Sequence, residues 1–158
     1  MIVPKKHKFS IREDFSAFEF REFTKQVISK VEQKYGKAIM FEHGANRKES
    51  LTGCGVDHAH FHIVPTGSIK SELSFTSMEW KQITLTEISE HIPFGCEYLL
   101  YSEDPVLNKG YVHIVKTPES QFFRKAIAKS IGIPNKFSYK KHPFWKNSRA
   151  TYTALRTK

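Results

Sequence analysis

One stretch decides the predicted fold: Asp57-His58-Ala59-His60-Phe61-His62-Ile63-Val64-Pro65. Its residue types alternate with the period of a β-strand, in which successive side chains point to opposite faces. The three histidines would therefore share one face, while alanine, phenylalanine and isoleucine pack in a core on the other. Three of the eight histidines in the chain fall within this window. That density favours a functional site over a half-buried strand with a solvated histidine face.

Composition indicates a globular chain. The 158 residues are 39% apolar and 13% aromatic, enough for one domain, residues 1–158, with a sizeable core. A net charge of +9 favours an anionic partner such as a nucleotide or nucleic acid, although a solvated basic surface gives the same count. The two cysteines, Cys54 and Cys96, form no CxxC motif and indicate neither a disulfide framework nor a thiolate metal site. With no apolar run of roughly 18 residues and no secretory signal, we expect a cytoplasmic protein without a membrane partner.

The elements around the histidine stretch predict an α+β fold. Apolar residues recur at helical spacing over 16–35 and Gly36 follows them, which predicts one long helix packed on a sheet. The helix core stripe would comprise Phe20, Phe23, Val27, Ile28, Val31 and Tyr35. Further strands are expected at 37–42, 96–101 and 111–115, and a polar loop at 43–53. Residues 71–92 would hold one or two short helices with Trp80 buried.

The C-terminal part offers a second candidate binding region. Thr117 and Pro118 are typical of a helix start, so a helix is expected over 117–131. Ser120, Gln121 and Arg124 would lie near its N-terminus as an anion site, and an ordinary capped surface helix explains the pattern equally well. The tail, 136–158, is basic with interleaved aromatic residues. Packing on the sheet is favoured there over contact with nucleic acid.

Two chemistries need several imidazoles on one strand face. An HxH pair can supply two zinc ligands, but the neighbouring candidates to complete such a site are few: Glu42, Cys54 and Asp57, the last on the opposite face. Alternatively, a neutral imidazole can attack phosphorus and form a phosphoramidate, which splits one difficult displacement into two easier ones. Flanking donors would then stabilise the phosphoryl oxygens.

The histidine stretch resembles the signature of the histidine triad (HIT) family of nucleotide hydrolases and transferases, in which three histidines alternate with apolar residues. Met1-Ile2-Val3-Pro4-Lys5-Lys6-His7 is similar to the strand and turn before the long helix of that family. Phe41-Glu42-His43-Gly44 is similar to the strand that precedes its phosphate loop, and Gly53-Cys54-Gly55-Val56-Asp57 to the approach to the triad. The resemblance covers roughly residues 1–66, in matching order and spacing.

The resemblance implies a role for each residue. His60 would be the nucleophile that attacks the α-phosphate, with a backbone carbonyl fixing its tautomer. His62 would contact phosphate oxygens and His58 would orient the pair, with neither metal nor cofactor. The phosphate and nucleotide would be bound by Gly53, Cys54, Gly55, His43, Gln121 and Arg124.

The fold implied is a five-stranded antiparallel HIT-like sheet with one long helix, in which residues 1–66 form the core and 67–158 a C-terminal extension with additional strands and a helix packed on it. The family's nucleobase pocket lies on a hairpin and helix that would precede Met1. Either the start has been placed late, or the extension rebuilds the pocket. Family members also carry a polar residue and then Ser or Thr where this chain has Cys54 and Gly55. Two side-chain phosphate contacts would be missing or replaced by backbone N–H groups.

These inferences favour an enzyme, a nucleotide phosphoramidase, hydrolase or nucleotidyltransferase that acts at the α-phosphate through a nucleotidyl-histidine intermediate. The substrate partner would be a nucleotide or nucleoside phosphate, and the family's frequent pairing implies a homodimer as one option. A non-catalytic nucleotide- or RNA-binding module is the alternative, with nucleic acid as a partner that is not favoured. A zinc-dependent hydrolase is the least favoured of the three.

Overall fold

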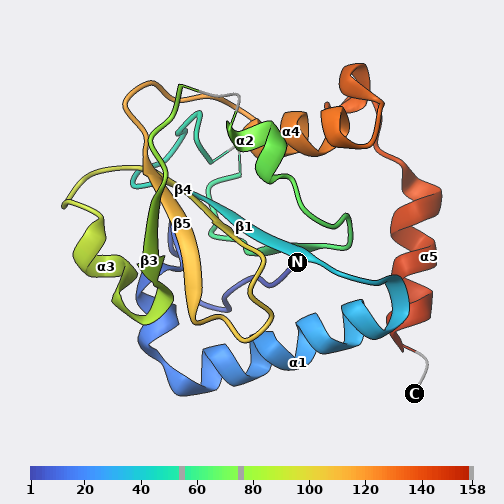
Figure 1. Cartoon of the computed structure of the whole chain (residues 1–158), viewed down its shortest axis with the longest axis horizontal. Helices are drawn as coiled ribbons and strands as arrows, with labels where there is room; N and C mark the ends of the chain where they lie inside the picture. The colour runs from blue at the N-terminus through green and yellow to red at the C-terminus, as the bar shows by residue number, and fades with distance from the viewer. Residues whose placement is uncertain (54–55, 75–76, 157–158) are drawn as a thin grey trace.

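A computed structural model describes residues 1–53, 56–74 and 77–156. At its centre is a five-stranded antiparallel sheet with the strand order β2-β1-β4-β5-β3 (Figure 1). The strands are β1 (Ile39–Gly44), β2 (His62–Val64), β3 (Lys81–Thr84), β4 (Tyr98–Ser102) and β5 (Lys109–Ile114). The predicted α+β class with an antiparallel sheet is confirmed. Strands β3, β4 and β5 all come from the chain after residue 66, and β4 pairs directly with β1.

The helices are α1 (Phe18–Tyr35), α2 (Lys70–Ser74), α3 (Ile88–His91), α4 (Phe122–Ser130) and α5 (Trp145–Arg156), with short 3₁₀ turns at Arg12–Ser16, Leu85–Glu87 and Pro134–Lys136. None of the helices in the described ranges is long and apolar enough to span a bilayer. The predicted long helix is α1. Its buried stripe is Thr24, Ile28 and Val31, and the expected core residues Phe23 and Tyr35 are 54% and 40% exposed. Phe23 lies roughly 100° around the helix from the buried Thr24, which turns its side chain toward solvent.

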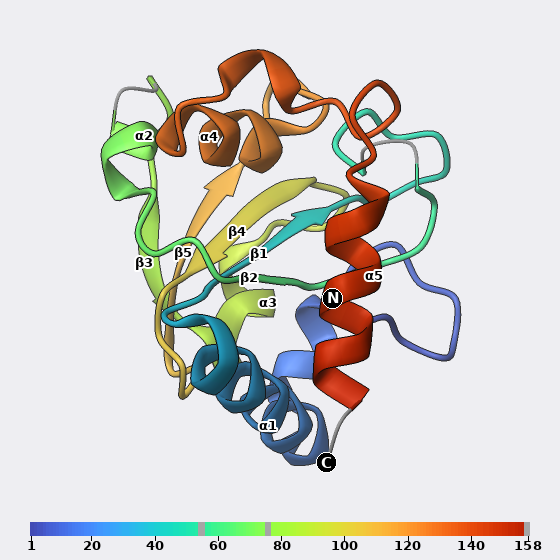
Figure 2. The same cartoon turned by 90° about the vertical axis from the view of Figure 1, so that its right-hand side faces the viewer.

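Each face of the sheet carries its own apolar core. Helix α1 covers one face, where Ile28 and Val31 pack with Met40 and Leu100. Helix α4 covers the other face (Figure 2), where Phe122 and Phe123 pack with Phe41, Ile39 and Tyr101. Because side chains alternate along a strand, successive residues of β1 and β2 point to one face and then to the other.

The alternation brings two histidines to the α4 face. In β1, Phe41 packs on the α4 side, and His43, two residues further on, shares its direction. Phe41 pairs with His62 across the β1–β2 ladder. Strand β2 is shorter than expected, since it begins at His62 and Phe61 forms only a bridge to Ile2, with two hydrogen bonds of 2.8 Å. The predicted alternation of burial nonetheless holds, with Ala59, Phe61 and Ile63 in the core.

Several predicted boundaries are wrong for tertiary reasons. The 71–92 region contains β3, an unpredicted four-residue edge strand whose single buried residue, Ile83, leaves little pattern to detect. Trp80, expected to be buried, is half-buried. Strand β1 runs on through Gly44, so His43 belongs to a strand and not to the 43–53 loop. The other strands, β4 and β5, lie within two residues of their predicted bounds.

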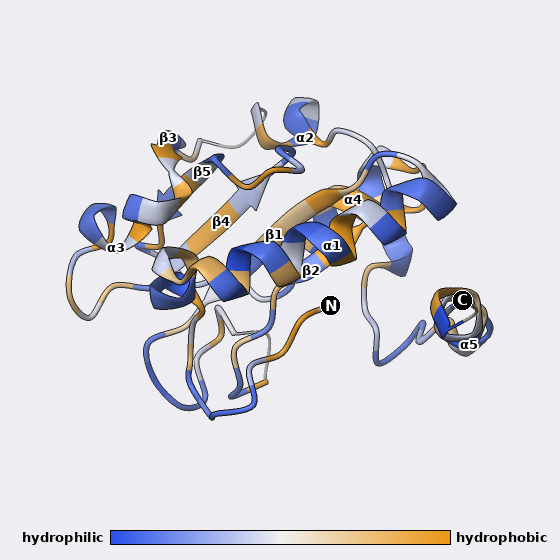
Figure 3. Ribbon diagram, turned by 90° about the horizontal axis from the view of Figure 1, so that it is seen from below, coloured by the Kyte–Doolittle hydropathy of each residue, from blue (hydrophilic) through white to orange (hydrophobic). Residues whose placement is uncertain are grey.

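The predicted helix at 117–131 begins five residues late. Thr117 does not cap it, and α4 starts at Phe122 after Gln121, whose φ of 60° is left-handed. The reason is tertiary, because the first two residues of α4 are aromatic and buried in the core. The tail was expected to pack on the sheet, but α5 buries none of its residues and stands apart from the sheet (Figure 3).

Candidate functional site

The histidine stretch lines a pocket of about 310 Å³ on the α4 face. His58, His60 and His62 all contribute to it, together with His43 from β1 and Arg124 from α4. The remaining wall is formed by the N-terminal segment, by Val56 and by the tail: Met1, Val3, Val56 and Tyr139. Segments far apart in the sequence therefore meet around the histidines.

The ring of His60 is held by the backbone of its own stretch. Its Nδ1 lies 2.9 Å from the carbonyl oxygen of His58. A carbonyl oxygen only accepts hydrogen bonds, so Nδ1 carries the proton and donates it. In the neutral ring, Nε2 then has a free lone pair. The structure thus places a backbone carbonyl where the resemblance implies one.

His58 ties the triad to the N-terminal turn. Its Nε2 donates a hydrogen bond of 2.8 Å to the carbonyl oxygen of Pro4. The ring of His7 meets the ring of His58 edge to face, with centroids 5.3 Å apart. The backbone N–H of Ala59 donates to the carbonyl of Lys8 at 2.7 Å. These contacts fix the backbone whose carbonyl holds the His60 ring.

His62 lies between an aromatic ring and the His60 ring. It stacks on Phe41 with ring centroids 4.4 Å apart, and meets His60 edge to face at 4.8 Å. Burial, followed by the neighbouring His60, lowers the pKa of His62 to about 2. Its imidazole is therefore neutral at physiological pH, and it offers the site hydrogen bonds and not a positive charge.

His43 is a buried neighbour of the triad, with 4% of its surface exposed. Burial, followed by the charges of His60 and Arg124, lowers the pKa of His43 to about 3. Its Nε2 accepts a hydrogen bond of 3.5 Å from the backbone N–H of Phe123, so Nδ1 carries the proton. Among the described residues this Nδ1–H has no hydrogen-bond partner. A buried donor that lines a pocket and has no partner among the described residues is suited to a hydrogen bond with a ligand.

Arg124 brings a cation to the site. Its Nε donates a hydrogen bond of 2.9 Å to the carbonyl of Phe137, and its guanidinium lies over the ring of Tyr139, 5.3 Å from the centroid. These two contacts with the tail orient the side chain beside the histidines. Gln121 and Gly53 do not belong to the described lining of the pocket. Cys54 and Gly55 lie outside the described residues.

Sequence reasoning missed two aromatic residues at the site. Phe41 was assigned to a strand without a role at the site, and Tyr139 to the packing of the tail. The alternation of β1 points Phe41 to the same face as His43, so the register with the histidine stretch would have revealed the first. Nothing local indicates that Tyr139 returns to Arg124, which is fifteen residues away.

Within the described parts of the chain, no group of three or more His, Cys, Asp or Glu side chains is arranged to hold a metal ion. We also compared the chain with models of known protein families, with curated proteins and with solved structures, and none of them matches. The chemistry of the site therefore has to be argued from its own geometry. That geometry combines an oriented imidazole with a free Nε2, two neutral imidazoles and a guanidinium.

Proposed function

We propose that the protein is a nucleotidyl hydrolase or transferase of the histidine triad type, with His60 as its nucleophile. The observation that carries the proposal is the hydrogen bond from His60 Nδ1–H to the carbonyl of His58, which leaves Nε2 free within a pocket that also contains Arg124. An imidazole held in one tautomer and facing a cation suits attack on an anionic phosphoryl group. The HIT-like architecture, with α1 on one face and the triad on the other, belongs to the same proposal.

The reaction has two balanced steps. His60 Nε2 attacks the α-phosphorus, a P–N bond forms, and the bond from phosphorus to the leaving group breaks, the leaving group taking a proton from solvent. The imidazolium that results keeps its Nδ1–H on the His58 carbonyl, which stabilises the positive charge. Water or another acceptor then attacks phosphorus, the P–N bond breaks, and the proton of the attacking water or acceptor passes to solvent. Neutral His60 is restored, with nucleoside monophosphate or a transferred nucleotidyl group as product.

The neutral rings of His62 and His43 would hold the phosphoryl oxygens by hydrogen bonds. Because burial keeps His62 and His43 uncharged, their contribution is N–H donation, and Arg124 contributes positive charge. The Nδ1–H of His43, which has no partner in the part of the chain that the structure describes, supports this assignment, since a phosphoryl oxygen would satisfy it. His58 acts through His60 as a positioning residue.

Replacing His60 tests the proposal by turnover. We expect His60→Ala to reduce the hydrolysis of a nucleoside 5′-phosphoramidate by at least about a thousandfold, since it removes the imidazole whose Nε2 is oriented for attack. The matched control is His91→Ala, which removes a histidine that lies on α3 and does not line the pocket. Turnover retained by the His60 variant, with its melting temperature unchanged, contradicts the proposal.

One observation favours a second function, a non-catalytic RNA-binding module. Helix α5 exposes Trp145 and Tyr152, at 76% and 61%, alongside Lys146 and Arg149. Exposed aromatic rings beside cations can stack on unpaired bases and contact the phosphate backbone. This function predicts RNA binding that weakens with salt and is lost in a Trp145→Ala, Arg149→Glu variant, with no covalent adduct. RNA binding that the variant retains would exclude α5 as its site.

A further inference from the structure

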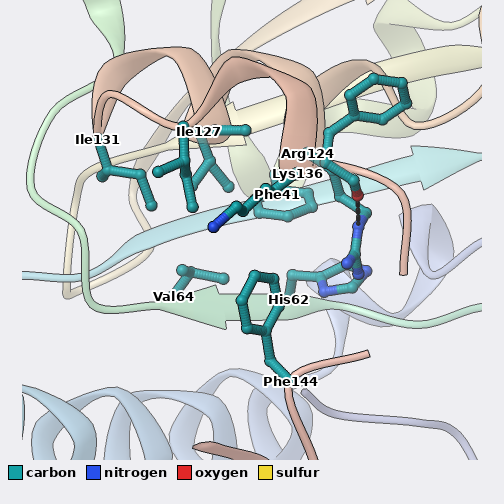
Figure 4. A pocket seen from close by; sticks show the side chains of 11 residues that line it. Phe41, His62, Val64, Arg124, Ile127, Ile131, Lys136 and Phe144 are labelled. Carbon is teal, nitrogen blue, oxygen red and sulfur yellow. Dashed lines mark hydrogen bonds between the residues drawn. The ribbon is translucent and has the colours of Figure 1, made fainter. Parts of the chain in front are cut away.

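A second pocket, of about 200 Å³, lies next to the triad pocket and shares His62 and Arg124 with it (Figure 4). Phe41 and Val64 of the sheet form one wall, and Ile127 on α4 and Ile131, directly after it, form the opposite wall. Phe144, just before α5, closes a third side. The pocket is thus built jointly by the histidine strands and by the chain after residue 66.

The lining of this second pocket combines apolar side chains with a few basic ones. Branched aliphatic side chains and phenylalanine rings make up most of it, and its only polar side chains are His62, Arg124 and Lys136. All three are basic residues, and the described lining includes no carboxylate or amide. Pockets for whole drug-sized ligands are roughly 300–1,000 Å³, so this one suits a single apolar ring system. The two cations, Arg124 and Lys136, suit an anionic group attached to that ring.

The backbone at Phe144 supports a binding role. Phe144 has a φ of 50°, in the left-handed region that non-glycine residues rarely adopt. Its carbonyl accepts hydrogen bonds from the N–H groups of Asn147 and Ser148, at 2.9 and 3.2 Å, and so begins α5. The ring is nevertheless 43% exposed and lines the pocket. Strain that stabilises no core but places an aromatic ring beside a site is typical of functional residues.

We propose that this pocket binds a flat apolar group of the substrate, joined to the phosphoryl group that His60 attacks. The inference rests on the proposed function and adds the substrate's class: a phosphate ester or phosphoramidate that carries a ring system. Two parts of such a substrate have this chemistry, the nucleobase and a ring on the leaving group. Since the described lining offers few groups for reading base edges, selection is by shape and apolar contact.

Two substrate series separate these sources. In the first, uridine 5′-phosphoramidates carry either methylamine or benzylamine as leaving group; in the second, the leaving group is methylamine and the base is uracil or adenine. We expect kcat/KM to favour the larger ring by about tenfold or more in one series, because burial of a ring stabilises the transition state. A preference in the first series assigns the pocket to the leaving group, and in the second to the base.

Two pocket variants test the assignment. Phe144→Ala removes one wall, and Ile131→Trp fills the pocket from a side chain that is 54% exposed, so neither disturbs a core residue. Both should reduce the preference to about twofold or less. The matched control is Phe94→Ala, whose ring is 100% exposed and lies outside the pocket, and it should retain the preference.

The outcomes for the pocket and for the chemistry are distinguishable. The pocket assignment alone is overturned if a His60 adduct forms but neither series shows a ring preference. It is also overturned if both pocket variants retain the preference. No adduct and no turnover with any of the substrates overturns the proposed function. In that case calorimetric binding of the benzylamine compound decides the pocket, and an affinity equal in the native chain and Phe144→Ala overturns it.

Discussion

His60 and His62 lie two positions apart but differ in hydrogen bonding and burial, because each ring contacts different atoms. His60 donates through Nδ1 to a carbonyl and keeps Nε2 free, whereas His62 is stacked on Phe41 and held neutral by burial. The resemblance implied the first arrangement, including the carbonyl. It did not indicate the burial of His43, which depends on Phe123, a residue 80 positions away.

Burial also sets the protonation of Glu42, which lies on the opposite face of the sheet. Its carboxyl is fully buried and accepts hydrogen bonds from the Ile11 N–H, at 2.7 Å, and from the Tyr98 hydroxyl. Burial raises the pKa of Glu42 to about 8, although both hydrogen bonds oppose the shift. At this carboxyl, between pH 4.5 and about 8, the folded chain therefore binds more protons than the unfolded chain. The contribution of Glu42 to the free energy of unfolding falls as pH rises through that range.

We predict that Glu42→Gln removes this loss of stability. Glutamine keeps the shape and stays neutral, so the free energy of unfolding of the native chain minus that of the variant should fall by a few kcal/mol between about pH 5 and pH 9. Urea denaturation at a series of pH values measures this difference. Glu90→Gln, at an exposed position, is the control, and its difference from the native chain should stay constant with pH. Parallel curves for the native chain and Glu42→Gln would contradict the account.

At the scale of elements, α4 builds the site. It brings Arg124 to the histidines and buries Phe123 against Phe41 and His43, with ring centroids 4.7 and 5.1 Å apart. Sequence patterns predict α1 and β1 well, because local periodicity and a closing glycine mark them. They predict the start of α4 poorly, because the signal of Thr117 and Pro118 is local while the burial of an aromatic pair is tertiary.

The end of β1 depends on a close contact that only glycine allows. A Cβ on Gly44 would lie 2.1 Å from Cε1 of Tyr98, whose ring is fully buried. We predict that Gly44→Ala lowers the free energy of unfolding by about 2–3 kcal/mol, since the ring has to move. Gly67→Ala, with open space around it and a φ of 66°, should cost only about 1 kcal/mol. Equal costs in urea denaturation would contradict this packing.

At the scale of the whole molecule, the two faces of the sheet differ in what they carry. The α1 face carries a continuous core, and the α4 face carries the histidines and both pockets. The sequence was sufficient for the fold class and for the histidine face, because both follow from alternation within single stretches. It was insufficient for β3, for the exposed α5 and for the return of Tyr139 to Arg124, because these depend on contacts between distant segments.

The central claim is that His60 forms a covalent bond to phosphorus. Its most direct test is the intact mass of the protein after brief, acid-free mixing with a nucleoside phosphoramidate, followed by peptide mapping. We predict a mass gain of one nucleoside monophosphate, located on His60 and absent from His60→Ala. A substrate that is bound without any mass gain, or an adduct on another residue, would contradict it.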